Sequence, residues 1–246
     1  MYLIKNGVSY TLPTYAALNG LQAKFRNSDD SKMFQHGGIN TADNKMDSRE
    51  IEIGIFIDGQ NQSDYFSQVN ELKRYLSRPN QQLYITDDMY INISSIGQIE
   101  EEFYDGFYLV KAELTITLKA LDPFFYRSAD ETFTEVITET DHQFTVNNPG
   151  SADTPVIITM TANELCDQVV LTNNTDSNRV VNYADSNFRQ DSVLRISTID
   201  GTVLLDGNNT INNFTGTFLR LLPGDNIFTY QGGACVVKID YPVRWI

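Results

Sequence analysis

The chain is poor in the residues that most often carry redox, nucleophilic or metal chemistry. Its 246 residues include two cysteines, two histidines and one tryptophan. Two cysteines 69 positions apart and two isolated histidines fit none of the common zinc patterns. His36-Gly37-Gly38 is not a phosphate loop, because no strand leads into it and no Lys-Ser/Thr pair follows. The sequence therefore assigns no catalytic, cofactor-binding or metal-binding residue, and we expect no cofactor.

Positive charge is also scarce. Lys and Arg total 18 against 32 Asp and Glu, which gives a formal net charge of −14. Affinity for DNA and for anionic membranes comes largely from cations, so both kinds of binding are disfavoured. No apolar stretch approaches the ~18 residues that a transmembrane helix needs. The first residues lack the basic and apolar regions of a signal peptide, and we expect a soluble protein made in the cytoplasm.

The few candidate reactive groups have simpler interpretations. Cys166 and Cys235 lie in strand-like apolar runs, so we expect two buried, reduced thiols rather than a Cys–His pair with His142. The acidic runs at 87–88 and 100–102 are expected to be solvated turns, not the opposed carboxylates of a glycosidase. The segment from Asp43 to Asp47 lacks the glycine and glutamate of an EF-hand loop.

The first half of the chain reads as a β domain with one helix. Residues 2–5 and 8–10 flank Asn6-Gly7, the pair best suited to a type I′ hairpin turn. A polar stretch over 26–48 follows, and unstructured segments of that length are usually functional or mobile. Residues 50–57 then alternate isoleucine with other residues, a period of two that predicts a strand.

One helix is predicted after that strand. Ser63 is its expected N-cap and Pro79 its expected stop. The apolar positions that recur at helical spacing are Tyr65, Val69, Leu72 and Leu76.

Three strands are predicted after the helix, over 83–86, 90–99 and 107–119. In the last of these, Tyr108, Val110 and every second residue after them form an apolar face, and Lys111 and its alternates form a polar one. Pro123 then closes the first half, because it cannot donate to a sheet ladder.

The second half is predicted to be an antiparallel β-sandwich or jelly roll. Eight short β-rich runs are separated by turn pairs such as Asp200-Gly201 and Pro223-Gly224. We place the boundary at residues 128 and 129, which gives domains 1–128 and 129–246. The first contains 12 basic and 17 acidic residues, and the second 6 and 15, so neither is basic. The eight runs cover 143–147, 155–161, 169–172, 193–198, 203–205, 217–222, 227–231 and 235–241.

A set of landmarks in fixed order resembles the distal tail protein (Dit) family of tailed phages and prophages. The landmarks extend over essentially the whole chain. They are Leu121-Asp122-Pro123-Phe124-Phe125-Tyr126, residues 144–150, residues 155–158, Asn173-Asn174, residues 194–197, Asp200-Gly201, residues 221–226 and Tyr241-Pro242-Val243-Arg244-Trp245.

This resemblance implies a mainly β fold: a tail-tube-like β-barrel or sheet domain with one helix at 1–128, and a galectin-like β-sandwich at 129–246. It implies a homo-hexameric ring at the distal end of the tail that joins the major tail tube protein to the tail-associated fibre or lysin protein. Such rings often carry receptor-binding proteins, and DNA passes through the lumen without specific binding. The resemblance also implies a virion location after assembly in the host cytoplasm. Residues 26–48 are a candidate for inter-subunit or tube contacts, and 241–246 for packing back on the first domain.

Two other functions remain open at this stage. One is a carbohydrate-binding adhesin, since β-sandwiches often bind saccharides by stacking on aromatic rings. The only tryptophan, Trp245, is one residue from the end, which argues mildly against that function. The other is an enzyme, which the lack of any nucleophile and base signature disfavours.

Overall fold

The computed structural model describes residues 1–12, 17–25, 29–31, 38–40, 45–76, 80–104 and 108–246. It divides the chain into two compact units, Met1–Phe125 together with Ile246, and Tyr126–Trp245. Over the described residues the fold is mainly β with one α-helix, α1, as predicted. The domain boundary expected at 128 and 129 stays a prediction.

Unit 1 begins with the predicted hairpin. Strand β1 (Tyr2–Lys5) pairs antiparallel with β2 (Val8–Thr11). Asn6 and Gly7 have φ of 51° and 75°, the positive values that a type I′ turn requires. The hairpin is extended by β7 (Gln81–Thr86) and β8 (Met89–Ile93), in the order β2-β1-β7-β8.

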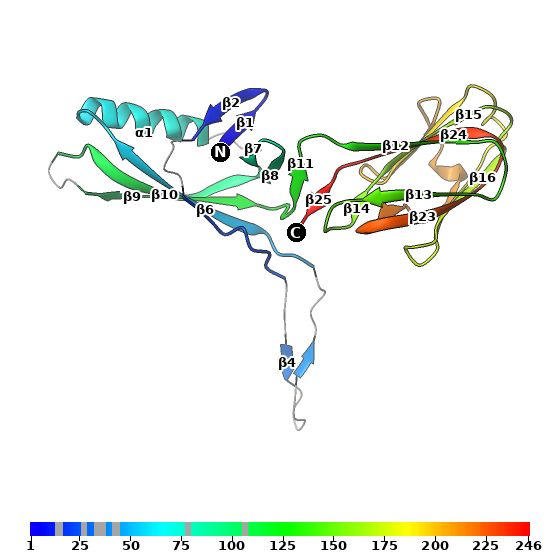
Figure 1. Cartoon of the computed structure of the whole chain (residues 1–246), viewed down its shortest axis with the longest axis horizontal. Helices are drawn as coiled ribbons and strands as arrows, with labels where there is room; N and C mark the ends of the chain where they lie inside the picture. The colour runs from blue at the N-terminus through cyan, green and yellow to red at the C-terminus, as the bar shows by residue number, and fades with distance from the viewer. Residues whose placement is uncertain (13–16, 26–28, 32–37, 41–44, 77–79, 105–107) are drawn as a thin grey trace. The chain divides into compact units, whose positions relative to one another are not determined.

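The second sheet of unit 1 has the strand order β3-β6-β10-β9. Its long central strands are β6 (Arg49–Asp58) and β10 (Lys111–Ala120), which pair along their whole length. The edges are β3 (Ala17–Asn19) and β9 (Ser95–Phe103). Helix α1 (Gln62–Leu76) lies along one side of this sheet (Figure 1).

The core of unit 1 forms between α1 and the sheet. Every second residue of β6 and β10 is buried, which is the alternation that a sheet with one covered face requires. The four predicted helix positions are likewise buried, at 0–3% exposure. The residues that meet in this layer include Ile51, Ile53, Ile55, Ile57, Leu114, Ile116, Leu118, Tyr65, Val69, Leu72 and Leu76.

The structure corrects several details of the first half. Helix α1 begins one residue before Ser63, and its N-cap is Asn61, whose Oδ1 accepts a hydrogen bond from the backbone N–H of Asp64 at 3.0 Å. The strand expected over 107–119 begins only at Lys111, because Leu109 has φ of 51° and interrupts the extended chain. Tyr108 is consequently 74% exposed rather than buried.

Two more predictions in this region were wrong in part. Residues 90–99 form parts of two strands, β8 and β9, and not one. The acidic run 100–102 belongs to β9 and is not a turn. Within the polar stretch 26–48, β4 (Asp29–Ser31) pairs with β5 (Gly38–Asn40). His36, Pro79 and the rest of that polar stretch up to residue 44 lie outside the described residues.

Unit 2 is a sandwich of two antiparallel sheets. One has six strands in the order β12-β24-β15-β18-β19-β20, and the other has five in the order β13-β23-β16-β17-β21. The first comprises β12 (Glu131–Ile137), β24 (Cys235–Tyr241), β15 (Ile157–Ala162), β18 (Val193–Ser197), β19 (Thr202–Leu205) and β20 (Asn208–Asn209). The second comprises β13 (His142–Asn148), β23 (Gly224–Gln231), β16 (Gln168–Asn173), β17 (Arg179–Ala184) and β21 (Phe214–Gly216).

The remaining elements are short. They are β11 (Phe125–Arg127), which begins at the unit boundary, the pair β14 (Thr154–Pro155) and β22 (Arg220–Leu221), the 3-10 helix η1 (Ile211–Asn213), and β25 (Arg244–Trp245). The sequence prediction missed four strands of the sandwich: β12, β17, β20 and β21. Cys166 lies in the connection before β16 and not in a strand, although it is buried as expected, as is Cys235.

Candidate interaction surface

The sequence assigned no catalytic or ligand-binding residues, and the described residues bring together no cluster of three or more potential metal ligands. His142 lies 2.9 Å from Glu135 through its Nε2 and does not contact either cysteine in any described interaction. No helix within the described ranges is long and apolar enough to cross a membrane.

The most distinctive surface of unit 1 is the uncovered side of the sheet β3-β6-β10-β9. Side chains alternate between the two faces of a sheet. In β6 and in β10, the residues that alternate with the buried ones therefore point away from α1. The strand register puts alternate residues of β9 on the same side, and six residues of these three strands there are acidic. We call these residues the acidic face: Glu50, Glu52, Asp58, Glu100, Glu102 and Glu113.

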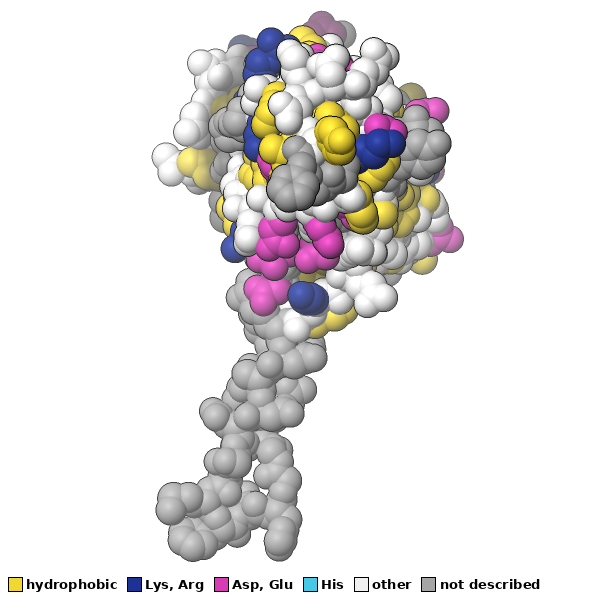
Figure 2. All heavy atoms as spheres, turned by 90° about the vertical axis from the view of Figure 1, so that its left-hand side faces the viewer, with side chains coloured by type: hydrophobic (Ala, Val, Ile, Leu, Met, Phe, Trp, Pro, Cys, Tyr) yellow, Lys and Arg dark blue, Asp and Glu magenta, His cyan; other side chains and the backbone are white. Residues whose placement is uncertain are grey.

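Two lysines share this side of the sheet. The ammonium group of Lys111 lies 3.0 Å from the carboxylate of Asp58, and Lys119 is directly opposite Glu50 in the strand register. The acidic face therefore has an excess of four negative charges over these two lysines. Acidic side chains also gather in one group on the end of unit 1 seen in Figure 2.

Like charges are paired across strands within the acidic face. Glu102 of β9 is directly opposite Glu113 of β10, an arrangement that destabilises a sheet by a few tenths of a kcal/mol up to about 1 kcal/mol. The phenol of Tyr104 donates a hydrogen bond to Glu113 at 2.6 Å, and this bond is the main cause of the raised pKa of Tyr104. No described cation lies between these two carboxylates.

Exposed aromatic rings border the acidic face. The rings of Phe56 and Tyr104 lie 5.9 Å apart between centroids, and these residues are 36% and 58% exposed. Their positions at the ends of β6 and β9 leave the acidic side chains next to an apolar margin. Aromatic side chains are enriched where proteins contact one another.

The acidic face does little to stabilise unit 1 itself. Its side chains are on the solvent side, and the ion pair between Lys111 and Asp58 is exposed and contributes about 0–1 kcal/mol. A surface that breaks the rules of cross-strand pairing without a gain in stability indicates function rather than folding. Sequence reasoning missed this surface because it placed 100–102 in a turn.

The polar residues of unit 2 show a different pattern, because they satisfy one another. Arg220 donates to Asp176 at 3.0 Å and to Asp153 at 2.7 Å, and Arg179 lies 3.1 Å from Asp176. Asp176 is 5% exposed, so two guanidinium groups neutralise a buried carboxylate. The cluster holds the loops at one end of the sandwich together and leaves no described donor directed at a ligand.

Comparison with protein families gives one match. Residues 149–245 match the family described as siphovirus-type tail component, C-terminal domain. No curated protein matches the chain.

Solved structures match over the whole chain. SPP1 Dit (gp 19.1), described as a paradigm of the hub adsorption apparatus in phages that infect Gram-positive bacteria, has a TM-score of 0.79 at 14% identity. That match covers 100% of this chain and 99% of SPP1 Dit. A chain of the phage p2 baseplate in its activated conformation with Sr gives a TM-score of 0.42 at 8% identity, covering 97% of this chain and 96% of the other.

Proposed function

We propose, from the confirmed resemblance of this chain to the phage distal tail proteins, that it is a structural protein of a phage tail. The observation that carries the proposal is the agreement of two independent matches. Residues 149–245 match a siphovirus tail component family, and the whole chain has the fold of SPP1 Dit. In this proposal the chain forms a hexameric ring at the distal end of the tail and joins the tail tube to the tail-tip or baseplate proteins. Assembly would take place in the host cytoplasm.

The acidic face supports a role in guiding DNA without binding it. A ring that places this surface toward its axis would present the carboxylates of the central strands β6 and β10 of every copy to the lumen, and would leave those of the edge strand β9 beside the neighbouring copy. Carboxylates repel phosphates, and salt screens this repulsion with a Debye length of about 8 Å at physiological ionic strength. DNA would therefore pass the ring without a strong hold on its wall.

Unit 2 is proposed as the docking platform for host-adhesion devices. Its sandwich is compatible with a galectin-like domain, and the polar cluster around Asp176 ties its end loops into a fixed surface.

A purely structural role also agrees with the state of the reactive groups. Both thiols are buried, and burial raises the pKa of each. A raised pKa keeps a thiol protonated and poorly nucleophilic at neutral pH. We therefore propose that the chain is not an enzyme.

Light scattering together with a glycan array tests the proposal against the carbohydrate-binding alternative. The full chain should give a mass of about six times 27.9 kDa and bind no glycan. A monomer with saturable glycan binding would instead identify an adhesin.

A further inference from the structure

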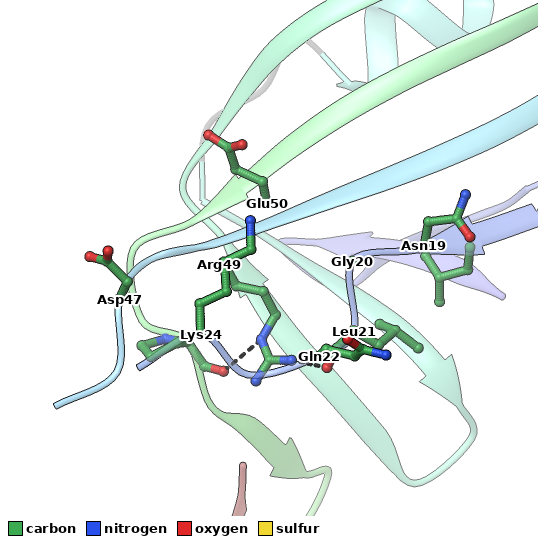
Figure 3. A pocket seen from close by; sticks show the side chains of 10 residues that line it. Asn19, Gly20, Leu21, Gln22, Lys24, Asp47, Arg49 and Glu50 are labelled. Carbon is green, nitrogen blue, oxygen red and sulfur yellow. Dashed lines mark hydrogen bonds between the residues drawn. The ribbon is translucent and has the colours of Figure 1, made fainter. Parts of the chain in front are cut away.

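Arg49, the first residue of β6, is a buried cation with one unused donor. It is 3% exposed. Its Nε donates to the carbonyl of Pro123 at 3.0 Å, and its Nη1 donates to the carbonyl of Leu21 (Figure 3). The guanidinium also lies 4.6 Å from the ring centroid of Phe125. Its Nη2 is buried and has no hydrogen-bond partner among the described residues.

The charge of Arg49 is not balanced within the described part of the chain. Both of its hydrogen bonds go to neutral carbonyls, and no described carboxylate lies within ion-pair distance of it. Burial lowers the pKa of its guanidinium, but arginine stays protonated in proteins. A buried charge without a counterion is costly, so this position favours an incoming anion.

A cavity of about 460 Å³ lies beside this group and is lined in part by Arg49. Lys24, Asn19 and Gln22 also line it, and each can donate hydrogen bonds to an anion. Asp47 and Glu50 on the same wall offset the two cations, which disfavours a highly charged ligand such as a nucleic acid. A planar, singly charged carboxylate suits the fork of a guanidinium best.

We infer that the cavity at Arg49 binds a carboxylate side chain of a second copy of this chain, with Nη2 as the donor that the single chain leaves unused. The inference rests on the proposed ring and names one contact within it.

The position of the cavity favours a second copy as the source of the carboxylate. The cavity is lined by residues of β3 and of the start of β6, at one edge of the sheet β3-β6-β10-β9. At the opposite edge, β9 presents Glu100 and Glu102 to solvent. A closed ring is built from unlike surfaces that meet in the same way at each seam. The β9 edge therefore offers carboxylates, and the β3 edge offers a cation without a counterion.

Access to Nη2 requires a local change in the cavity wall. Two hydrogen bonds hold the segment 20–24: the N–H of Asp47 donates to the carbonyl of Lys24 at 2.8 Å, and Arg49 donates to the carbonyl of Leu21. A carboxylate that reaches the guanidinium by displacing Leu21 replaces a neutral acceptor with an anion, and the ladder between β6 and β10 stays intact.

The first test measures ring stability by light scattering over a dilution series of the full chain. Arg49→Gln should raise the dissociation constant of the ring by about tenfold or more, the effect expected for one charged hydrogen bond. Lys111→Gln is the matched control, because it removes the same charge from the same sheet at an exposed pair, and it should change the constant by less than about threefold. Equal ring stability in wild type and Arg49→Gln would overturn the inference and leave the ring intact. A wild-type chain that is monomeric at every concentration would instead overturn the ring.

The second test identifies the carboxylate and does not depend on Arg49→Gln folding well. Arg49→Lys keeps the charge and introduces an amine that carbodiimide can couple to a carboxylate. A mixture of ¹⁵N-labelled and unlabelled copies is cross-linked and analysed by mass spectrometry. A bond from the introduced amine to a carboxylate of the other isotope supports the inference. A bond only to Asp47 or Glu50 of the same copy, or none in an intact ring, contradicts it.

A third measurement separates a protein carboxylate from a free one. Sodium acetate is titrated into the full chain and thermal stability is followed, with chloride at equal ionic strength as the control. Acetate should compete with the carboxylate of the second copy for the cavity, and so lower the thermal stability of the wild-type ring. It should have no effect on Arg49→Gln. If acetate stabilises the protein only when Arg49 is present, and the ring forms equally well without Arg49, the cavity binds a free carboxylate. That result would overturn the contact with a second copy.

Discussion

At the scale of single residues, the buried thiols show how environment decides chemistry. Cys235 is 0% exposed and Cys166 is 1% exposed. Burial is the main cause of the raised pKa of both thiols, to about 11 for Cys235. A buried cysteine behaves as a small apolar residue, so these two contribute packing rather than reactivity.

Stability should fall at alkaline pH in a way that depends on Cys235. Below pH 9 the thiol is neutral in both the folded and unfolded states, so its contribution is fully present. Between pH 9 and 11 the unfolded thiol ionises and the folded one does not, and up to on the order of 2 kcal/mol is lost as the pH rises. Denaturant unfolding at pH 8 to 11 should show a shallower decline in Cys235→Ala. An unchanged decline would show that the thiol is not protected.

The carboxylate of Asp176 should matter more than exposed ion pairs. Asp176→Asn removes the shared anion of Arg220 and Arg179, but Arg220 keeps Asp153 and both arginine side chains are more than a third exposed, so we expect a loss of about 2 kcal/mol in the free energy of unfolding. Lys238→Met is the control, since Lys238 pairs with Asp240 at the surface and should cost less than about 1 kcal/mol. Equal costs for the two variants in denaturant melts would refute this ranking.

At the scale of elements, the start of α1 separates prediction from observation. Asn61→Ala should destabilise the protein by about 1 kcal/mol, because it removes the oxygen that accepts from the N–H of Asp64. Ser63→Ala should be nearly neutral, since Ser63 is inside the helix. Thermal melts of both variants measure the difference, and a larger loss for Ser63→Ala would restore the cap predicted from sequence.

The acidic face should lower the free energy of unfolding of the isolated chain. Replacing Glu102 by Gln removes the repulsion from Glu113 and should raise the free energy of unfolding by about 0.5 kcal/mol at low salt. The gain should shrink as salt screens the charges. A loss of stability in Glu102→Gln would mean that the face serves folding and not function.

Sequence periodicity predicted the elements whose burial is regular. The isoleucines of β6 and the four apolar positions of α1 are buried as their spacing indicated. Prediction failed where one residue decides the backbone. The positive φ of Leu109 shortens β10, and nothing in the local sequence announces it. The acidic run was placed in a turn because glutamate is disfavoured in strands on local preference, and pairing with β10 overrides that preference.

Candidate sites were harder to predict than elements. Arg49 has no motif around it, and its unused Nη2 follows from the carbonyls of Leu21 and Pro123, which are 28 and 74 residues away. Such a group is visible only when tertiary contacts are known. Local sequence carries no signal of it.

At the scale of the whole molecule, the two units suggest a division of labour. The first carries the acidic face and the cavity at Arg49, and the second carries the region matched to a tail component family. We expect limited proteolysis of the full chain to cut first near 126–130, where the boundary between the two compact units nearly coincides with the predicted domain boundary. Mass spectrometry of the fragments checks this, and early cuts within β10 would contradict it.

The central claim is that copies of this chain close into a ring with their acidic faces toward the axis. Sedimentation velocity of the full chain over a salt series tests it most directly. Six acidic faces around one axis repel each other, and salt screens that repulsion. The account predicts a hexamer whose population grows from low to moderate salt. Added DNA should sediment separately from the protein. A chain that stays monomeric at every salt and concentration, or that binds DNA at physiological salt, would contradict it.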